Sequence, residues 1–214
     1  MQTQSKKHRL FSFKRLPMDI ARLVCIPLIP IYRVRRLTPT GEKYRGRIRG
    51  GGILAANHTG FSDTFVVGVT VWYRRMFFLA AETVMRPKLR SWLLRGVGAI
   101  KIDREAADIE AIRKSVDVLK QGYLLTIFPQ GGITHSDNIQ ALKSGAALIA
   151  LQAGVPIIPM HIMPRKHWYS RRTVVIGDAI DPRNYIEKKF PSTADIDRVS
   201  RVLAEEMNRC IIHL

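Results

Sequence analysis

Short apolar runs alternate with segments of helical periodicity from residue 43 onward, and this alternation limits the possible folds more than any other feature of the sequence. Repeated β-α units of this kind build an α/β domain, with a largely parallel central sheet and helices on both of its faces. The expected strands are 53–56, 77–80, 99–102, 123–128, 157–162 and 172–176, and the expected helices are 63–72, 91–95, 109–122, 142–152 and a last one that Ser192-x-x-Asp195 opens.

Three loops that follow expected strands carry polar residues suited to chemistry. These loops hold residues 57–63, 103–104 and 130–132. In parallel sheets the reacting groups gather in the loops at the carboxyl ends of the strands. We therefore expect the three loops to share one cleft.

The first loop sets His58 and Asp63 five positions apart at a strand-to-helix turn. An imidazole takes up a proton at neutral pH, and a carboxylate on its second ring nitrogen fixes the tautomer and stabilises the imidazolium. No evident covalent nucleophile accompanies the pair, since Cys25 and Cys210 lie in distant apolar segments. The pattern therefore favours deprotonation of a hydroxyl and direct transfer, and backbone N–H groups near Gly60 are candidates for the oxyanion site. The structural alternative is a histidine at a strand end and an aspartate in the first helical turn.

The other two loops also have structural alternatives. Asp103 is a candidate cap for a helix that begins near Glu105, with Arg104 as a solvated charge. Gly131 and Gly132 either let a ligand approach the backbone or make a tight turn.

Taken together, these loops and the segment 155–159 resemble, in order and spacing, the four motifs of the 1-acylglycerol-3-phosphate acyltransferase family. The first motif matches Asn57, His58 and Asp63, and the second matches Gly98, Asp103 and Arg104. The resemblance covers about residues 45–180. It implies an O-acyltransferase without a cofactor or metal, which moves a fatty acyl chain from an acyl-carrier-protein or coenzyme A thioester to a lysophospholipid hydroxyl. The acceptor expected first is 1-acylglycerol 3-phosphate, which gives phosphatidate. The residues implied are His58 as general base, Asp63 as its orienting partner, and Arg104, Gln130, Gly131 and Gly132 as binding residues for the acceptor and its phosphate.

The third motif departs from the family pattern. The sequence Gln130-Gly131-Gly132-Ile133 stands where the family usually has Glu-Gly-Thr-Arg. Glutamine keeps a hydrogen-bond acceptor and loses the negative charge, while isoleucine removes a bidentate phosphate donor. Lys143 and His135 are candidates for a replacement cation. The departure indicates either an altered acceptor or a weakened enzyme, and the presence of His58 and Asp63 favours the altered acceptor.

Positive charge is concentrated at the N-terminal end. The chain holds 35 Lys and Arg against 17 Asp and Glu, and residues 1–49 hold 13 of the cations with only Asp19 and Glu42 as acids. An anionic partner is therefore expected, and an anionic membrane, an acidic or phosphorylated carrier and nucleic acid all fit. Arginine-glycine alternation at 45–50 is compatible with RNA, but aromatic residues are sparse there and we weigh against nucleic acid.

The segment 1–42 predicts a basic amphipathic helix that docks on membrane, ahead of the α/β acyltransferase domain at 43–214. Pro17 suits a first helical turn, and the stretch 20–32 is too short for a bilayer span and is interrupted by prolines. No cleavage site of a signal peptide precedes the arginines that follow. We expect a peripheral protein at the cytoplasmic face of a membrane, in a reducing compartment. On one side of the expected helix lie Ile20, Leu23, Val24 and Pro27, and away from it point Asp19 and Arg22.

Two alternatives stay open, and a third is discounted. The helix of the N-terminal segment could pack on the domain's own core instead of lipid. The chain could be a non-catalytic lipid-surface protein, which binds liposomes without consuming a thioester. A metal hydrolase is possible by residue type, but the spacing of His58, Asp63, His135 and Asp137 matches no tight ligand set.

Overall fold

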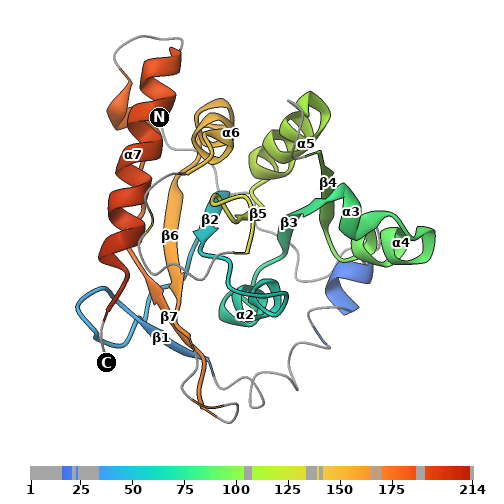
Figure 1. Ribbon diagram of the computed structural model, residues 1–214, viewed down its shortest axis with the longest axis horizontal. Coiled ribbons are helices and arrows are strands. Elements are labelled where there is room, and N and C mark those ends of the chain that lie inside the picture. Colours follow the sequence, from blue (N-terminus) through green and yellow to red (C-terminus); the bar gives the residue numbers. More distant parts are fainter. Residues whose placement is uncertain are drawn as a thin grey trace.

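A single mixed sheet runs through the molecule (Figure 1). The computed structural model describes residues 16–20, 23, 34–103, 108–133, 139, 142–164, 167, 170–186 and 191–212. Within these ranges the strand order is β1-β7-β6-β2-β5-β3-β4, and every neighbouring pair is parallel except β6 with β7. The largely parallel sheet expected from the sequence is therefore confirmed. The strands are β1 (Arg35–Leu37), β2 (Gly52–Ala56), β3 (Met76–Ala81), β4 (Ala99–Ile102), β5 (Leu124–Ile127), β6 (Ile157–Ile162) and β7 (Thr173–Ile176).

Helices cover both faces of the sheet, as predicted. Side chains alternate along β2, so Ile53 and Ala55 pack in one cluster with α5, α6 and α7, while Leu54 and Ala56 pack in another with α2. Figure 1 shows α2 separated by the sheet from α5 and α6. The helices are α2 (Asp63–Thr70), α3 (Glu82–Met85), α4 (Lys88–Gly96), α5 (Ile109–Lys120), α6 (Gly145–Ala153) and α7 (Thr193–Arg209), with a 3₁₀ helix at Pro182–Tyr185.

Local signals fix several helix ends. Ser192 and Asp195 form a complete capping box at the start of α7, as the sequence predicted, and Gly154 ends α6 with φ 65°. Asp108 caps α5 by accepting from Ala111 N. The carboxylate of Asp108 also accepts from the backbone N–H of Asp103. Asp108, at the start of α5, therefore has the capping role that the sequence analysis considered for Asp103.

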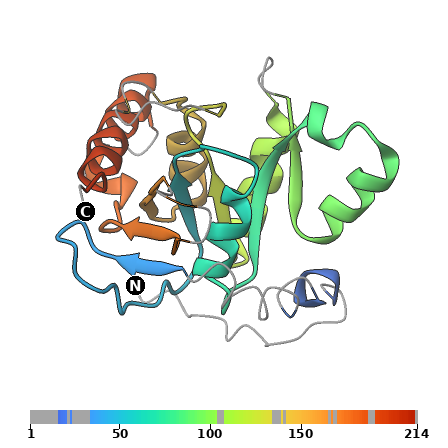
Figure 2. The same cartoon turned by 60° about the horizontal axis from the view of Figure 1, so that its bottom comes forward.

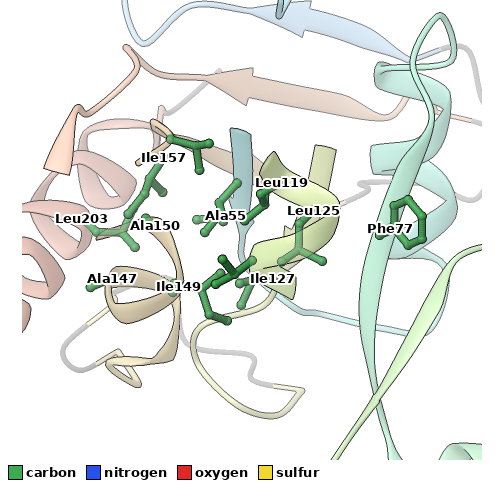
Figure 3. Packing of buried hydrophobic residues seen from close by; sticks show 14 of the residues in the cluster. Ala55, Phe77, Leu119, Leu125, Ile127, Ala147, Ile149, Ala150, Ile157 and Leu203 are labelled. Atoms are coloured by element: carbon green, nitrogen blue, oxygen red, sulfur yellow. The ribbon is translucent and has the colours of Figure 1, made fainter. Parts of the chain in front are cut away.

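The centre of the sheet is closely packed and apolar. Every residue of β2 is buried, as expected for a central parallel strand. Figure 3 shows Ala147 and Ala150 of α6 and Leu203 of α7 gathered against Ile157 and Ala55. Small residues on α6 let this helix approach the sheet closely. Each large aliphatic side chain buried here contributes about 1.5–3 kcal/mol.

The N-terminal segment contacts the domain more closely than the sequence suggested. Residues 16–20 are helical, and both Met18 and Asp19 are buried. Asp19 points away from the apolar side of the helix as predicted, but it points into the protein, where Arg75 Nε and Nη2 each donate to it at 2.9 Å. A buried guanidinium needs a charged partner, which explains the inward aspartate. Ile20 and Leu23 are exposed instead.

β1 lies within the segment 1–42, so the sheet begins before residue 43. The other residues of the expected amphipathic helix, namely Arg22, Val24 and Pro27, fall outside the described ranges. In the described part of the chain no helix is both long and apolar enough to cross a bilayer.

Candidate active site

His58 and Asp63 meet at the carboxyl end of β2. His58 follows the strand, Asp63 opens α2, and Nδ1 of the imidazole lies 3.1 Å from Oδ2 of the carboxylate. A carboxylate only accepts, so Nδ1 carries the proton and Nε2 carries the lone pair. The ring stacks on Phe128 with centroids 4.3 Å apart, and its side chain is 12% exposed. The geometry is that of a base with an orienting carboxylate.

The Asp63 carboxylate is held by its own turn. Oδ2 also accepts from the backbone N–H of Thr59 at 2.6 Å and of Gly60 at 2.7 Å, and the residue is completely buried. Burial by itself would raise the pKa of Asp63, but the hydrogen bonds from His58, Gly60 and Thr59 outweigh it, and the pKa lies below its usual value. Asp63 is therefore a carboxylate at neutral pH.

The same bonds narrow the oxyanion site expected near Gly60. The N–H groups of Thr59 and Gly60 point at Asp63, so these two groups do not form it. The physical reason is that a buried carboxylate needs donors, and the nearest backbone groups of the turn supply them.

Asn57 joins this turn to the neighbouring strand. Its carbonyl oxygen accepts from Ile162 N at 2.6 Å, and its amide donates to Ile162 O at 3.1 Å. The buried Asn57 side chain thus extends the hydrogen-bonded ladder between β2 and β6 by one step. It thereby fixes the position of the next residue, His58. On the other side of the turn, Arg172 donates to Ser62 Oγ at 2.9 Å.

The third loop touches the first. Oε1 of Gln130 accepts from the backbone N–H of His58 at 3.2 Å, so the amide Nε2 points away from that bond. Gly131 has φ 77°, and a Cβ built on it would lie 2.6 Å from Cε and 3.3 Å from Nζ of Lys143. The lysine therefore crosses directly over the glycine, next to Gln130 and Gly132. His135 falls outside the described ranges.

The second loop is described only to Asp103. Arg104, the residue expected to contact the acceptor phosphate, lies outside the described ranges. β4 is the edge strand beside β3, and β3 in turn lies next to β5. The structure thus brings the first and third loops together and places the end of β4 along the same edge of the sheet.

His58 lines an apolar cavity of about 540 Å³. One wall follows a stripe along α2, from Phe61 just before the helix through Phe65 and Gly68 to Trp72 just beyond it. Strand β3 forms the wall opposite. Met18 and Arg75 lie at the start of β3, whereas His58 lies at the carboxyl end of the sheet. Other lining residues include Phe128 and Ile133 near the imidazole, Met76, Phe78 and Ala80 of β3, and Thr83, Val84, Leu94 and Val97 from the α3–α4 region.

Within the described ranges no group of three or more histidine, cysteine, aspartate or glutamate side chains is placed to hold a metal ion. Burial raises the pKa of the Cys210 thiol to about 12, so this cysteine is a poor nucleophile at neutral pH. Cys25 falls outside the described ranges.

Sequence reasoning missed several contacts of the site. These are the backbone bond of Thr59 within the turn, the ring of Phe128 against His58, and the hydrogen bond from Arg172 to Ser62. The sequence places Phe128 at the end of a strand before the third motif, but it does not indicate that this ring stacks on His58. Arg172 gave no signal, because its partner lies 110 positions away.

The known proteins that this chain resembles are named as acyltransferases. A 1-acyl-sn-glycerol-3-phosphate acyltransferase of Bacillus subtilis is 29% identical over 109 residues, which are 51% of this chain and 54% of that protein. The protein of the same name from Streptococcus pneumoniae is 34% identical over 50% of this chain and 40% of its own length. A lyso-ornithine lipid O-acyltransferase of Rhodobacter capsulatus is 30% identical over 46% of this chain and 34% of its own. The matched region is thus about half of these relatives or less.

A solved structure shares the fold. The 1-acyl-sn-glycerophosphate acyltransferase PlsC of Thermotoga maritima matches with a TM-score of 0.54 and 18% identity, over 89% of this chain and 79% of that one. The family model described as Acyltransferase matches residues 36–163, a span that includes the loops of His58 and of Gln130. Because this model covers more than half of the sequence, the chain belongs to the acyltransferase family.

Proposed function

We propose that this chain is an O-acyltransferase that moves a fatty acyl chain from an acyl-carrier-protein or coenzyme A thioester to the free hydroxyl of a lysophospholipid. The acceptor proposed first is 1-acylglycerol 3-phosphate, with phosphatidate as product. The observation that carries the proposal is the contact between His58 and Asp63, with His58 in the lining of an apolar cavity. The family and the names of its relatives support it.

In the proposed reaction the lone pair on Nε2 of His58 accepts the proton of the acceptor hydroxyl. The oxygen attacks the thioester carbonyl carbon, the tetrahedral intermediate collapses, and the C–S bond breaks. The imidazolium returns its proton to the departing thiolate, so an ester and a free thiol form without an acyl-enzyme. Asp63 stabilises the imidazolium while it exists, because its carboxylate contacts Nδ1.

The apolar cavity between α2 and β3 suits a fatty acyl chain. It has the volume of an ordinary ligand site and is lined mostly by aliphatic and aromatic side chains. Each methylene that leaves water there contributes about 0.8 kcal/mol. The chain would extend from the thioester at His58 along the helix stripe toward Met18.

The third loop is proposed to contact the acceptor's head group, together with Arg104. Its glycines let a phosphate approach the backbone, and Lys143 crosses Gly131 and offers a cation where the family usually has an arginine at position 133. The amide of Gln130 would donate to the head group, because its carbonyl is used by His58 N–H. Because Ile133 stands where the family usually has an arginine, a glutamate at position 130 would add a negative charge without that arginine to offset it.

The same loop supports a second acceptor. Ile133 removes the bidentate arginine, and a relative that carries the name lyso-ornithine lipid O-acyltransferase matches at 30% identity. A lysolipid with a different head group is therefore the alternative substrate within the same chemistry.

We also propose that the protein is peripheral, at the cytoplasmic face of an anionic membrane, with residues 1–42 as a docking segment. Leu16, Ile20 and Leu23 are exposed, and the segment is rich in cations. The same positive charge would attract an acidic acyl-carrier protein or the phosphates of coenzyme A.

The test is an acyl-transfer assay with the full chain, both thioester donors and a panel of lysolipids. Wild type should give product, and His58→Ala should give none. His167→Ala is the matched control, since His167 is exposed and does not line the cavity. Product only with another lysolipid would assign the third loop to that head group. No product with any acceptor would favour the non-catalytic lipid-surface alternative.

A further inference from the structure

Helix α4 turns its largest apolar side chains toward solvent. Leu89, Trp92 and Leu93 are 71%, 72% and 52% exposed, and none of the residues of α4 is buried. Their spacing of i, i+3 and i+4 places them on one side of the helix. Leu94, on another side, packs against the cluster of Met85, Ala80 and Ala99. A surface helix ordinarily packs its apolar face inward, so this orientation requires a reason.

Cations flank the exposed apolar face. On the helix wheel, Lys88 and Arg95 lie along one margin of it and Arg90 along the other, and α4 contains no acid. Arg86 precedes the helix and is also exposed. None of these four side chains takes part in an ion pair with any residue that the structure describes. The apolar face thus has positive charge on both sides.

The exposed face adjoins two other features. Residues 16–20 lie beside the end of α4, where a Cβ built on Gly96 would contact Pro17 Cβ at 3.4 Å (Figures 1 and 2). Leu16 and Ile20 of that segment are about half exposed. The inner side of α4 contributes Leu94 to the cavity that His58 also lines. One short helix therefore separates the cavity from the exposed apolar face.

We propose that α4 is a lipid-inserting helix. Leu89, Trp92 and Leu93 would enter the boundary between head groups and acyl chains of an anionic bilayer, while Lys88, Arg90 and Arg95 contact lipid phosphates. The proposal rests on the proposed function in one respect, since an enzyme of lysophospholipids has reason to meet a bilayer. It adds an anchor within the α/β domain, separate from residues 1–42, and it places the cavity wall at the lipid surface.

A bilayer fits this face better than a protein partner does. Indole and leucine side chains are favoured at the membrane interface, and lysine and arginine reach from there to anionic head groups. An acidic carrier protein would meet the cations, but Leu89, Trp92 and Leu93 are each more than half exposed and offer it no charge. The combination of both chemistries on one helix is what an interfacial helix requires.

The test is co-sedimentation of the full chain with phosphatidylcholine vesicles that contain or lack phosphatidylglycerol. Trp92→Ala should weaken binding about tenfold, and Leu89→Ala/Trp92→Ala/Leu93→Ala on the order of 100-fold. Replacing Lys88 and Arg90 with glutamine should weaken binding about fivefold for each cation, only where phosphatidylglycerol is present. Ile109→Ala is the matched control, because Ile109 is 77% exposed but lies at the start of α5. Brominated lipid should quench tryptophan emission in wild type and much less in Trp92→Phe.

Two further variants separate this proposal from the proposed function. His58→Ala should bind vesicles as wild type does, and the triple variant should acylate a monomeric short-chain lysolipid at the wild-type rate without vesicles. If wild type transfers no acyl chain but the triple variant still loses vesicle binding, the acyltransferase reaction fails and the lipid-inserting helix stands. Wild-type vesicle binding by the triple variant would overturn the proposal. Such binding with a selective loss of turnover on a carrier-protein donor would make α4 a protein-docking helix instead.

Discussion

Replacing Asp63 with asparagine tests the proposed base most directly. The amide oxygen can take the place of Oδ2, which accepts from His58, Thr59 and Gly60, so the turn keeps its geometry and loses only the charge. Each of these bonds weakens by about 1 kcal/mol when its acceptor becomes neutral. The amide also avoids the cost of several kcal/mol for a buried carboxylate. We therefore expect a net loss of only about 1 kcal/mol in the free energy of unfolding, or about 2–4 °C in Tm.

The effect on turnover should be far larger. An imidazolium forms next to the carboxylate in the transition state, and two unit charges about 4 Å apart attract by about 4 kcal/mol at an effective dielectric constant near 20. Losing that attraction corresponds to a rate about 10³-fold lower. The assay is thiol release from an acyl thioester with a saturating lysolipid, beside a thermal melt.

Asp197→Asn, an exposed change on α7, is the control for the charge itself. If Asp63→Asn turns over within tenfold of wild type while folding normally, Asp63 is an anchor of the turn and the proposed stabilisation of the imidazolium is wrong. A rate that falls together with a large drop in Tm would refute the argument that the amide fits the carboxylate's place.

Four further predictions follow from contacts described above. The pKa of Asp63 is lowered in the folded protein, so its stabilisation is present above its ordinary pKa of 3.8 and is lost as the pH falls below that value; the difference in free energy of unfolding between wild type and Asp63→Asn should shrink in acid denaturation series below that pH. Gly68→Leu should shift donor preference toward shorter acyl chains, by about fourfold for each methylene displaced, because Gly68 lines the cavity; an unchanged chain-length profile would place the acyl chain elsewhere. Gln130→Glu should keep the bond to His58 N–H but raise the KM of a phosphate-bearing acceptor about fivefold or more, with kcat little changed in steady-state assays. Asp19→Ala should lower the free energy of unfolding by about 3–5 kcal/mol in denaturant titrations, because Arg75 loses its buried carboxylate; a change below about 1 kcal/mol would contradict that account.

The sheet could be predicted from the sequence because its strands are apolar runs bounded by turn signals. β1 was missed, since three residues with two arginines at the edge of a sheet show no such pattern. α3 was missed for a similar reason, because four residues are too short to display helical periodicity. For α4 the sequence predicts only residues 91–95 as helical, and nothing in the pattern says that its apolar side chains point outward.

The contacts of the site likewise divide into local ones, which the sequence indicates, and distant ones, which it does not. His58 and Asp63 could be paired from the sequence because they belong to one turn. The bond from His58 N–H to Gln130 spans 72 positions, and it depends on β2 and β5 lying side by side in a specific register. The inward direction of Asp19 likewise depends on Arg75, 56 positions away. Contacts of this kind are set by tertiary packing and leave no local signal.

The ion pair between Asp19 and Arg75 has a practical consequence for shortened forms of the protein. A chain that starts after Asp19 would leave the guanidinium buried without its carboxylate, and would also lack Met18 from the cavity lining. Such a form would lose stability and expose one end of the cavity to solvent, whatever its affinity for membranes. If such a form bound vesicles weakly or turned over slowly, either the lost stability or the exposed cavity would be a sufficient cause. Forms made for crystallisation or for binding studies should therefore begin before Met18. The docking role of residues 1–42 should be tested by point substitution.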